Sequence, residues 1–267
     1  MMDDRPLRTL PEELMLVCAD PGTGAIKRPE FFKRALAGAV LAELELHGAI
    51  LIEDGRIVGL RPVQLDDPFV GGLFDKLAGD IRRGQPDADQ TRLASPPESL
   101  SQLRQDLPDG LVARVSAAAR SGIAAHMTKW PLHGWISTWR HFQDVERRCL
   151  EAMEARGLLI ARRRRVLGII PHVSWRAPSP SAAKESVARV DEAVRAVTLG
   201  GFGPPSRRTE YLVALFGAAG LSTRLYPGRR HRDIRKRIEQ VTSSLPIAAA
   251  AEYIRQADWK HRMSNSD

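Results

Sequence analysis

Clusters of arginine are the residues in this chain whose type and spacing could do chemistry. One run, Arg162 to Arg165, falls at the predicted turn of a hairpin, and a second basic stretch extends from Arg224 to Arg237. A guanidinium binds phosphate through paired, charge-assisted hydrogen bonds, so these clusters favour a phosphate-bearing partner, although a solvated surface would look the same. Trp130, Trp135 and Trp139 lie in one short segment. Tryptophan is common at the headgroup boundary of a membrane, and it is also common in protein cores.

The motifs of common enzymes and metal sites are absent from the sequence. It contains no glycine-rich nucleotide loop, no nucleophile elbow and no His-Glu-x-x-His helix. His126, His133 and His141 lack the spacing of metal ligands, and Cys18 and Cys149 lie in apolar helical patterns typical of small buried residues. We therefore expect no enzyme activity, no metal and no cofactor.

The composition favours a helical protein that binds anions. The chain has 267 residues, a formal net charge of +8 and a pI of about 10.0, and most of its 40 basic residues are arginine. This charge biases it towards nucleic acid, an acidic membrane surface or a phosphorylated ligand. An apolar content of 43% with only 6% aromatic residues favours packed helices. No secretory signal or segment of membrane-spanning length is present, so we expect a cytoplasmic protein.

The segment from Phe31 to Gly59 is predicted to form the core against which the elements that carry the arginine clusters pack. It begins as a helix that is apolar nearly all round, which predicts a core helix enclosed by other elements. Gly48 follows the last periodic residue, as expected for a helix C-terminus that needs a left-handed conformation. Asp54 and Gly55 then form the dipeptide best suited to a two-residue hairpin turn.

The same pattern of helix, glycine and hairpin occurs a second time around Gly157, after a predicted amphipathic helix at residues 137–156. We expect a mainly α fold, with apolar core helices surrounded by amphipathic helices and two small β-hairpins. Further helices are predicted at residues 111–126 and 211–221. One domain should span residues 9–259, with flexible ends at residues 1–8 and 260–267.

Two motifs resemble the Golgi phosphoprotein three family. They are a Leu-Pro-Glu-Glu-Leu helix that begins after Thr9, and the core-helix pattern from Gly38 to Gly48. The likeness continues through residues 145–159 and the helix at 211–221, and so covers nearly the whole chain in order. It implies a helical protein, of a compact bacterial type, that associates peripherally with a membrane and whose basic face binds phosphatidylinositol 4-phosphate or another anionic lipid headgroup. It also implies that cytosolic tails of membrane proteins are partners, as they are for eukaryotic members.

The resemblance does not transfer the headgroup-binding residues of the family. These are a Trp and an Arg ahead of and within the core helix, and two Arg on the helix before the later hairpin. In our register the corresponding positions hold Arg28, Ala37, Gln143 and Glu146. Arg28 adds a cation at the first of these positions, and three other arginines lie close to the remaining ones in sequence. We expect the four to form a shifted site for an anionic headgroup. The predicted residues are Arg28, Arg34, Arg140 and Arg147.

A winged-helix-like DNA-binding regulator is the alternative interpretation. An arginine-rich hairpin after a helix would suit it, with the hairpin in a minor groove and the helix in a major groove. Glu146, Glu151 and Glu154 argue against it, because phosphates would repel three carboxylates on the recognition helix. We therefore expect no nucleic-acid partner. The oligomeric state does not follow from the sequence.

Overall fold

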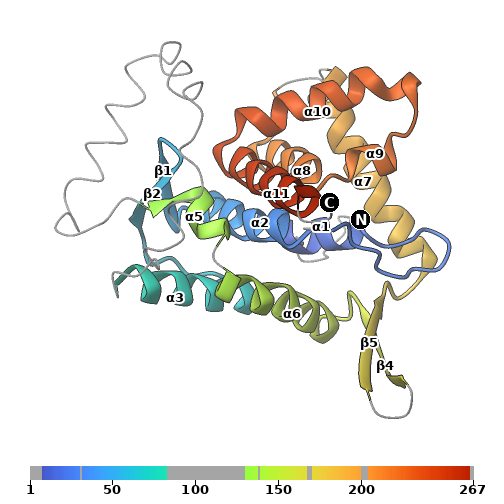
Figure 1. Cartoon of the computed structure of the whole chain (residues 1–267). Helices are drawn as coiled ribbons and strands as arrows, with labels where there is room; N and C mark the ends of the chain where they lie inside the picture. Colours follow the sequence, from blue (N-terminus) through green and yellow to red (C-terminus); the bar gives the residue numbers. More distant parts are fainter. Residues whose placement is uncertain are drawn as a thin grey trace, which may run out of the picture.

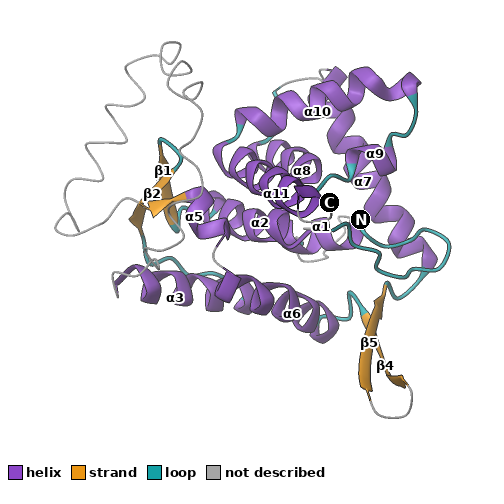
Figure 2. Ribbon diagram, viewed as in Figure 1, coloured by secondary structure: helices purple, strands orange, loops and turns teal. Residues whose placement is uncertain are grey.

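The computed structural model describes residues 8–30, 32–82, 130–137, 139–166, 170–199 and 204–264. Helices dominate this part of the chain and the strands form two small sheets, which confirms the predicted mainly α fold (Figure 2). The helix predicted at residues 111–126 lies outside the described residues. The elements are α1 (Leu10–Val17), α2 (Phe32–Leu46), β1 (Ile50–Glu53), β2 (Arg56–Leu60), α3 (Pro68–Arg82), β3 (Trp130–Pro131), α5 (Leu132–Ser137), α6 (Trp139–Ala155), β4 (Ile160–Val166), β5 (Ile170–Arg176), α7 (Pro180–Leu199), α8 (Arg207–Ala218), α9 (Ser222–Leu225), the 3-10 helix η4 (Arg229–His231), α10 (Arg232–Ser244) and α11 (Pro246–Ser264).

Helix α2 lies at the centre of the molecule, as its apolar sequence predicts. It contacts α1, α8 and α11 on one side and α3 and α6 on the other (Figure 1). Gly38 allows the close approach of α8 and α11, since a Cβ at this position would lie 3.0 Å from Leu215 Cδ2 and 3.4 Å from Ala251 Cβ. Because α2 is buried along nearly all of its length, its charged side chains must find partners within the protein. Glu43 is 2% exposed and accepts hydrogen bonds from the Leu10 backbone N–H and from Arg208.

The first hairpin has the predicted turn. Asp54 and Gly55 have φ angles of 48° and 67°, which is the left-handed pair that a two-residue turn of this kind needs. Strands β1 and β2 are antiparallel, and the short strand β3 pairs with β2 to make a three-stranded sheet. The sequence did not predict this third strand. The sheet lies against the core through Ile57, which is 1% exposed.

The two helix–glycine–hairpin units end their helices with the same hydrogen bonds. Gly48 has a φ of 68° and Gly157 a φ of 70°. The Gly48 N–H donates to the Glu45 carbonyl and the Ala49 N–H to the Leu44 carbonyl; the Gly157 N–H donates to the Glu154 carbonyl and the Leu158 N–H to the Met153 carbonyl. Both are Schellman motifs at equivalent positions, so the repeat seen in the sequence is confirmed as a structural repeat.

The second hairpin corrects one prediction. Arg162 to Arg165 lie within strand β4 rather than at the turn, because β4 extends to Val166 and pairs along its whole length with β5. Successive side chains of a strand point to opposite faces, so this run is divided between the two faces of the hairpin. The hairpin extends away from the helical body (Figure 1). Arg163 turns back to α6, where it forms an ion pair with Glu154 at 2.9 Å.

Helices α1 and α11 lie at the two ends of the predicted domain. Helix α1 begins after Thr9, whose backbone N–H donates to the Glu12 carboxylate at 2.9 Å. This is one half of a capping box, and it explains why the helix begins at this residue. Helix α11 continues past residue 259 to Ser264, so regular structure extends into the segment that was expected to be flexible.

Candidate anion-binding site

Arg28 lies in the loop before α2 and forms an ion pair with Glu146 of α6. The two side chains are 37% and 25% exposed, respectively. Burial lowers the pKa of the Arg28 guanidinium from its ordinary value, because the surrounding protein disfavours the free charge. A second anion in contact with Arg28 would therefore meet a cation that is already positioned and partly desolvated.

Positions 28 and 146 are two of the four that correspond, in our register, to the headgroup site of the resembling family. These two positions are in contact through the ion pair. Of the other two positions, Ala37 is 1% exposed within α2, and Gln143 lies in α6 with a side chain outside the described residues. The carboxylate of Glu146 lowers the positive charge of this surface.

Arg34 is part of the protein core rather than an open anion site. It is only 7% exposed, and its guanidinium donates to the Asp258 carboxylate at 3.0 Å and to the carbonyls of Ile136 and Ser137 at 3.1 and 3.2 Å. These bonds join α2 to α5 and α11. A buried guanidinium needs such acceptors, because its five N–H groups are costly to leave unsatisfied.

Arg140 and Arg147 both lie on α6, seven residues apart, which corresponds to nearly two turns and so to one side of the helix. The side chain of Arg140 lies outside the described residues. Arg147 is 59% exposed and pairs with Glu151, one turn further on, at 2.9 Å. Exposed pairs of this kind are weak, so an incoming anion can compete for Arg147 at little cost.

A second group of cations lies on the α9–η4–α10 segment, and its first member, Arg224, contacts the Arg28 loop. Arg224 of α9 donates to the Lys27 carbonyl at 2.8 Å. Both Arg224 and Arg28 lie close enough to Cys18 to act on its thiol, although burial outweighs them and raises the Cys18 pKa to about 12. The α9–η4–α10 segment then presents several exposed cations, whereas Arg235 donates to the carbonyls of Tyr226 and Gly228. The exposed cations are Arg229, Arg230, Arg232, Lys236 and Arg237.

The described residues hold neither a metal-binding cluster nor a membrane-spanning helix. No group of three or more His, Cys, Asp or Glu side chains in that part of the chain could hold a metal ion. No helix within the same residues is long and apolar enough to cross a bilayer. Trp135 is buried at 6% exposure and so has the core role that was the alternative to a membrane role. The side chains of Trp130 and Trp139 lie outside the described residues.

The fold and this surface define a mainly helical protein built around one apolar helix, with arginines where the loop before that helix meets α6. The family model of Golgi phosphoprotein 3 (GPP34) matches residues 10–257, and the chain belongs to this family. The predicted resemblance is thereby confirmed. No curated protein matches the chain in a sequence comparison.

Sequence reasoning missed the burial of Arg34 and the ion pair of Arg28 with Glu146. The burial of Arg34 could have been predicted from the sequence around it. Arg34 follows a Phe-Phe-Lys segment and precedes an apolar run, and a cation within a core helix requires buried acceptors. That rule predicts a structural role for Arg34. The pairing of Arg28 with Glu146 left no comparable signal, because the two residues are far apart in the sequence and each is of a type common on surfaces.

Proposed function

We propose that this protein binds the anionic headgroup of a membrane lipid where the loop carrying Arg28 meets α6, and that it associates peripherally with the cytoplasmic face of a membrane. Phosphatidylinositol 4-phosphate, or another lipid with a phosphomonoester, is the proposed ligand. The observation that carries the proposal is the contact between Arg28 and Glu146 in a chain of the Golgi phosphoprotein 3 family.

The chemistry of this surface favours exchange of one anion for another. A phosphomonoester carries more charge than a carboxylate and offers three acceptor oxygens, so it competes with Glu146 for Arg28. Arg147 and Arg140 add cations to α6, the helix whose Glu146 contacts Arg28. Arg34 has a different part in the proposal, since it holds α2, α5 and α11 together and thereby fixes the start of α2 next to the Arg28 loop.

Recruitment of membrane proteins through their cytosolic tails is the second part of the proposed function. Its support is family membership together with the resemblance, and no described surface singles out a tail sequence. The DNA-binding alternative has less support. The carboxylates of Glu146, Glu151 and Glu154 lie on α6, the helix that would enter the groove, and would repel the phosphates of a DNA backbone.

The test is co-sedimentation with vesicles of phosphatidylcholine alone, with added phosphatidylserine, or with added phosphatidylinositol 4-phosphate. The variant carries Arg28→Ala, Arg140→Ala and Arg147→Ala, and leaves the buried Arg34 intact. We expect it to lose roughly tenfold to a hundredfold in affinity for phosphoinositide vesicles, since each charge-assisted hydrogen bond contributes more than a neutral one. Equal binding of variant and wild type to acidic vesicles would refute the site.

A matched control removes the same charge elsewhere. Arg232→Gln, Lys236→Gln and Arg237→Gln change three exposed cations of α10, which lies on the other side of α2 from α6 (Figure 1). This control should retain lipid selectivity. A converse variant, Glu146→Gln, removes the competing carboxylate and should tighten phosphoinositide binding by about threefold, the size of one partly exposed ion pair. Weaker binding of Glu146→Gln would show that Glu146 positions Arg28 rather than competing for it.

A further inference from the structure

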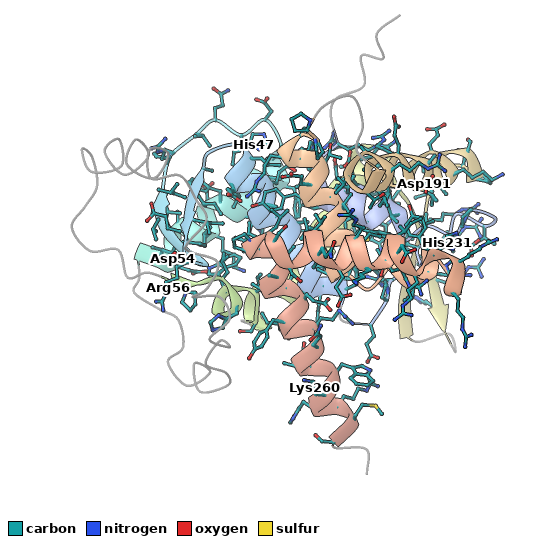
Figure 3. The ribbon with its side chains drawn as sticks, turned by 90° about the horizontal axis from the view of Figure 1, so that it is seen from above. His47, Asp54, Arg56, Asp191, His231 and Lys260 are labelled. Carbon is teal, nitrogen blue, oxygen red and sulfur yellow. The ribbon has the colours of Figure 1, made fainter. Side chains whose placement is uncertain are left out.

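The end of α11 exposes two large apolar side chains that the core cannot use. Trp259 and Met263 are each 53% exposed. They are four residues apart and therefore neighbours on one face of the helix. The buried stripe of α11 runs through Ile247, Ala251 and Ile254 and ends there. Figure 3 shows the end of α11 that carries Lys260 extending beyond the neighbouring helices.

Two ion pairs hold this end of α11 beside the Arg28 loop. Asp258 accepts from Arg34 at the start of α2, and Arg262 pairs with Glu30, two residues after Arg28 in the chain. These contacts have two consequences. They fix the orientation of the last turns of α11, and they neutralise the acidic groups at this point of the surface, where Lys260 is an additional exposed cation.

We infer that the last turns of α11, from Trp259 to Met263, form a second membrane contact that inserts its apolar pair into the interfacial layer of an anionic bilayer. This inference rests on the proposed function, and it adds an apolar anchor to the headgroup site. Tryptophan suits the depth at which acyl chains meet headgroups, and basic residues next to an apolar face suit the negative surface of an acidic membrane.

A second copy of this chain is a weaker candidate for the occupant. A stable interface between proteins buries about 1,000 Å² or more, whereas an aromatic side chain buries about 150–250 Å². The pair of Trp259 and Met263 is therefore too small to hold a dimer without a much larger surrounding surface. The basic ends of two copies would also repel each other, whereas an acidic bilayer attracts both.

The experiment compares Trp259→Ser/Met263→Ser with the wild type on the same three kinds of vesicle. We expect the affinity of this variant to fall by roughly tenfold to a hundredfold for every acidic vesicle, the equivalent of withdrawing one or two large apolar side chains from an apolar layer. Its preference for phosphatidylinositol 4-phosphate over phosphatidylserine should be unchanged. The control, Ile160→Ser/Val173→Ser, changes two other exposed apolar side chains, on the β4–β5 hairpin.

A direct readout places a fluorophore on the helix. Cys18 and Cys149 are both buried, so Met263→Cys can be labelled selectively with an environment-sensitive dye, and Gln240→Cys on α10 serves as the labelling control. Addition of phosphoinositide vesicles should shift the emission at position 263 to the blue and make it sensitive to a quencher in the acyl chains. The emission at position 240 should stay unchanged.

The outcomes separate this inference from the proposed headgroup site. If the Trp259→Ser/Met263→Ser variant, here called the serine variant, binds acidic vesicles as the wild type does, the apolar anchor is refuted while the headgroup site stands. If the serine variant loses binding and the Arg28, Arg140 and Arg147 variant does not, the anchor is supported and the headgroup site is refuted. If wild type binds no acidic vesicle, both proposals fail. A concentration-dependent dimer that the serine substitutions abolish would assign this face to a second copy instead.

Discussion

The two helix–glycine–hairpin units are alike in local structure and different in surroundings. Both helices end with a left-handed glycine and the same pair of backbone hydrogen bonds. In the first unit, α2 is buried along nearly all of its length and its hairpin is joined by β3 in a sheet. In the second unit, α6 exposes Arg147, and its hairpin extends into solvent with Ile160 and Val173 exposed (Figures 1 and 2).

This difference shows that one local pattern can serve two purposes. The first unit contributes stability, because an apolar helix at the centre of the molecule contacts most of the other helices. The second unit has one face on the core and leaves the other for charged residues, so it is the unit on which a binding surface can form. Burial, and not the cap or the turn, separates the two roles.

The largest expected effect comes from two leucines at equivalent positions of the two helices, each seven residues before the glycine that caps its helix. Leu41 in α2 is 0% exposed and Leu150 in α6 is 4% exposed. We expect Leu41→Ala to lower the free energy of unfolding by about 3–5 kcal/mol and Leu150→Ala by about 2–3 kcal/mol, because a cavity in the enclosed helix has neighbours on every side. Urea denaturation measures both. An equal cost would mean that α6 is as fully enclosed as α2.

Substitutions in the hairpins should lower the free energy of unfolding by less than Leu41→Ala does. The ratio between the effects in the two hairpins should nevertheless be larger than the ratio between the two leucines. Ile57→Ala in β2 removes a side chain that is 1% exposed, and should cost about 2–4 kcal/mol. Val173→Ala in β5 changes a side chain that is 43% exposed, and should change the free energy of unfolding by less than about 0.5 kcal/mol. Thermal unfolding of the two variants compares them. A large cost for Val173→Ala would indicate that another surface covers the second hairpin.

Alanine at the two C-terminal glycines should have equal effects. Gly48 and Gly157 have φ angles of 68° and 70°, and no atom lies within 4 Å of a Cβ added at either position. Each substitution should therefore cost only the backbone strain of a left-handed alanine, about 1–2 kcal/mol. Parallel urea titrations of Gly48→Ala and Gly157→Ala provide the measurement. A clear difference between them would show that the surroundings, and not the cap alone, fix these two conformations.

The smallest expected effect concerns pH and the point where α6 meets α1. Arg156, the residue directly after α6, contacts the buried carboxylate of Glu12 at 2.7 Å. Burial raises the Glu12 pKa, and it outweighs the Thr9 N–H and Arg156, which lower it. The folded protein therefore holds this proton more tightly than the unfolded chain, and the stability from Glu12 is present in acid and lost as the pH rises.

The comparison with Glu12→Gln isolates this group. The free energy of unfolding of wild type, relative to that of the variant, should decrease as the pH is raised from acid towards neutral. Denaturation of both proteins at a series of pH values measures this difference. A relative increase with pH would mean that the ion pair with Arg156 outweighs the cost of burying the carboxylate.

The candidate site was predictable only in part. The arginines of the predicted set lie on the expected elements, because the positions of α2 and α6 follow from apolar periodicity and from their glycine caps. The burial and pairing of each guanidinium were not predictable. Arg34 forms an ion pair with Asp258, near the other end of the chain, and Arg28 forms one with Glu146 of α6. The exposed pair at the end of α11 was also missed, because residues 260–267 were expected to be flexible.

The sequence by itself determined the core helix, the two glycine caps, the turn at Asp54 and Gly55, and the family. These depend on backbone preferences and on periodicity within a few residues, both of which can be identified in a single sequence. The tertiary structure decided which charges are buried, which are paired and which face solvent. Those properties depend on contacts between residues distant in the chain, and the identical caps of α2 and α6 show that local sequence does not fix them.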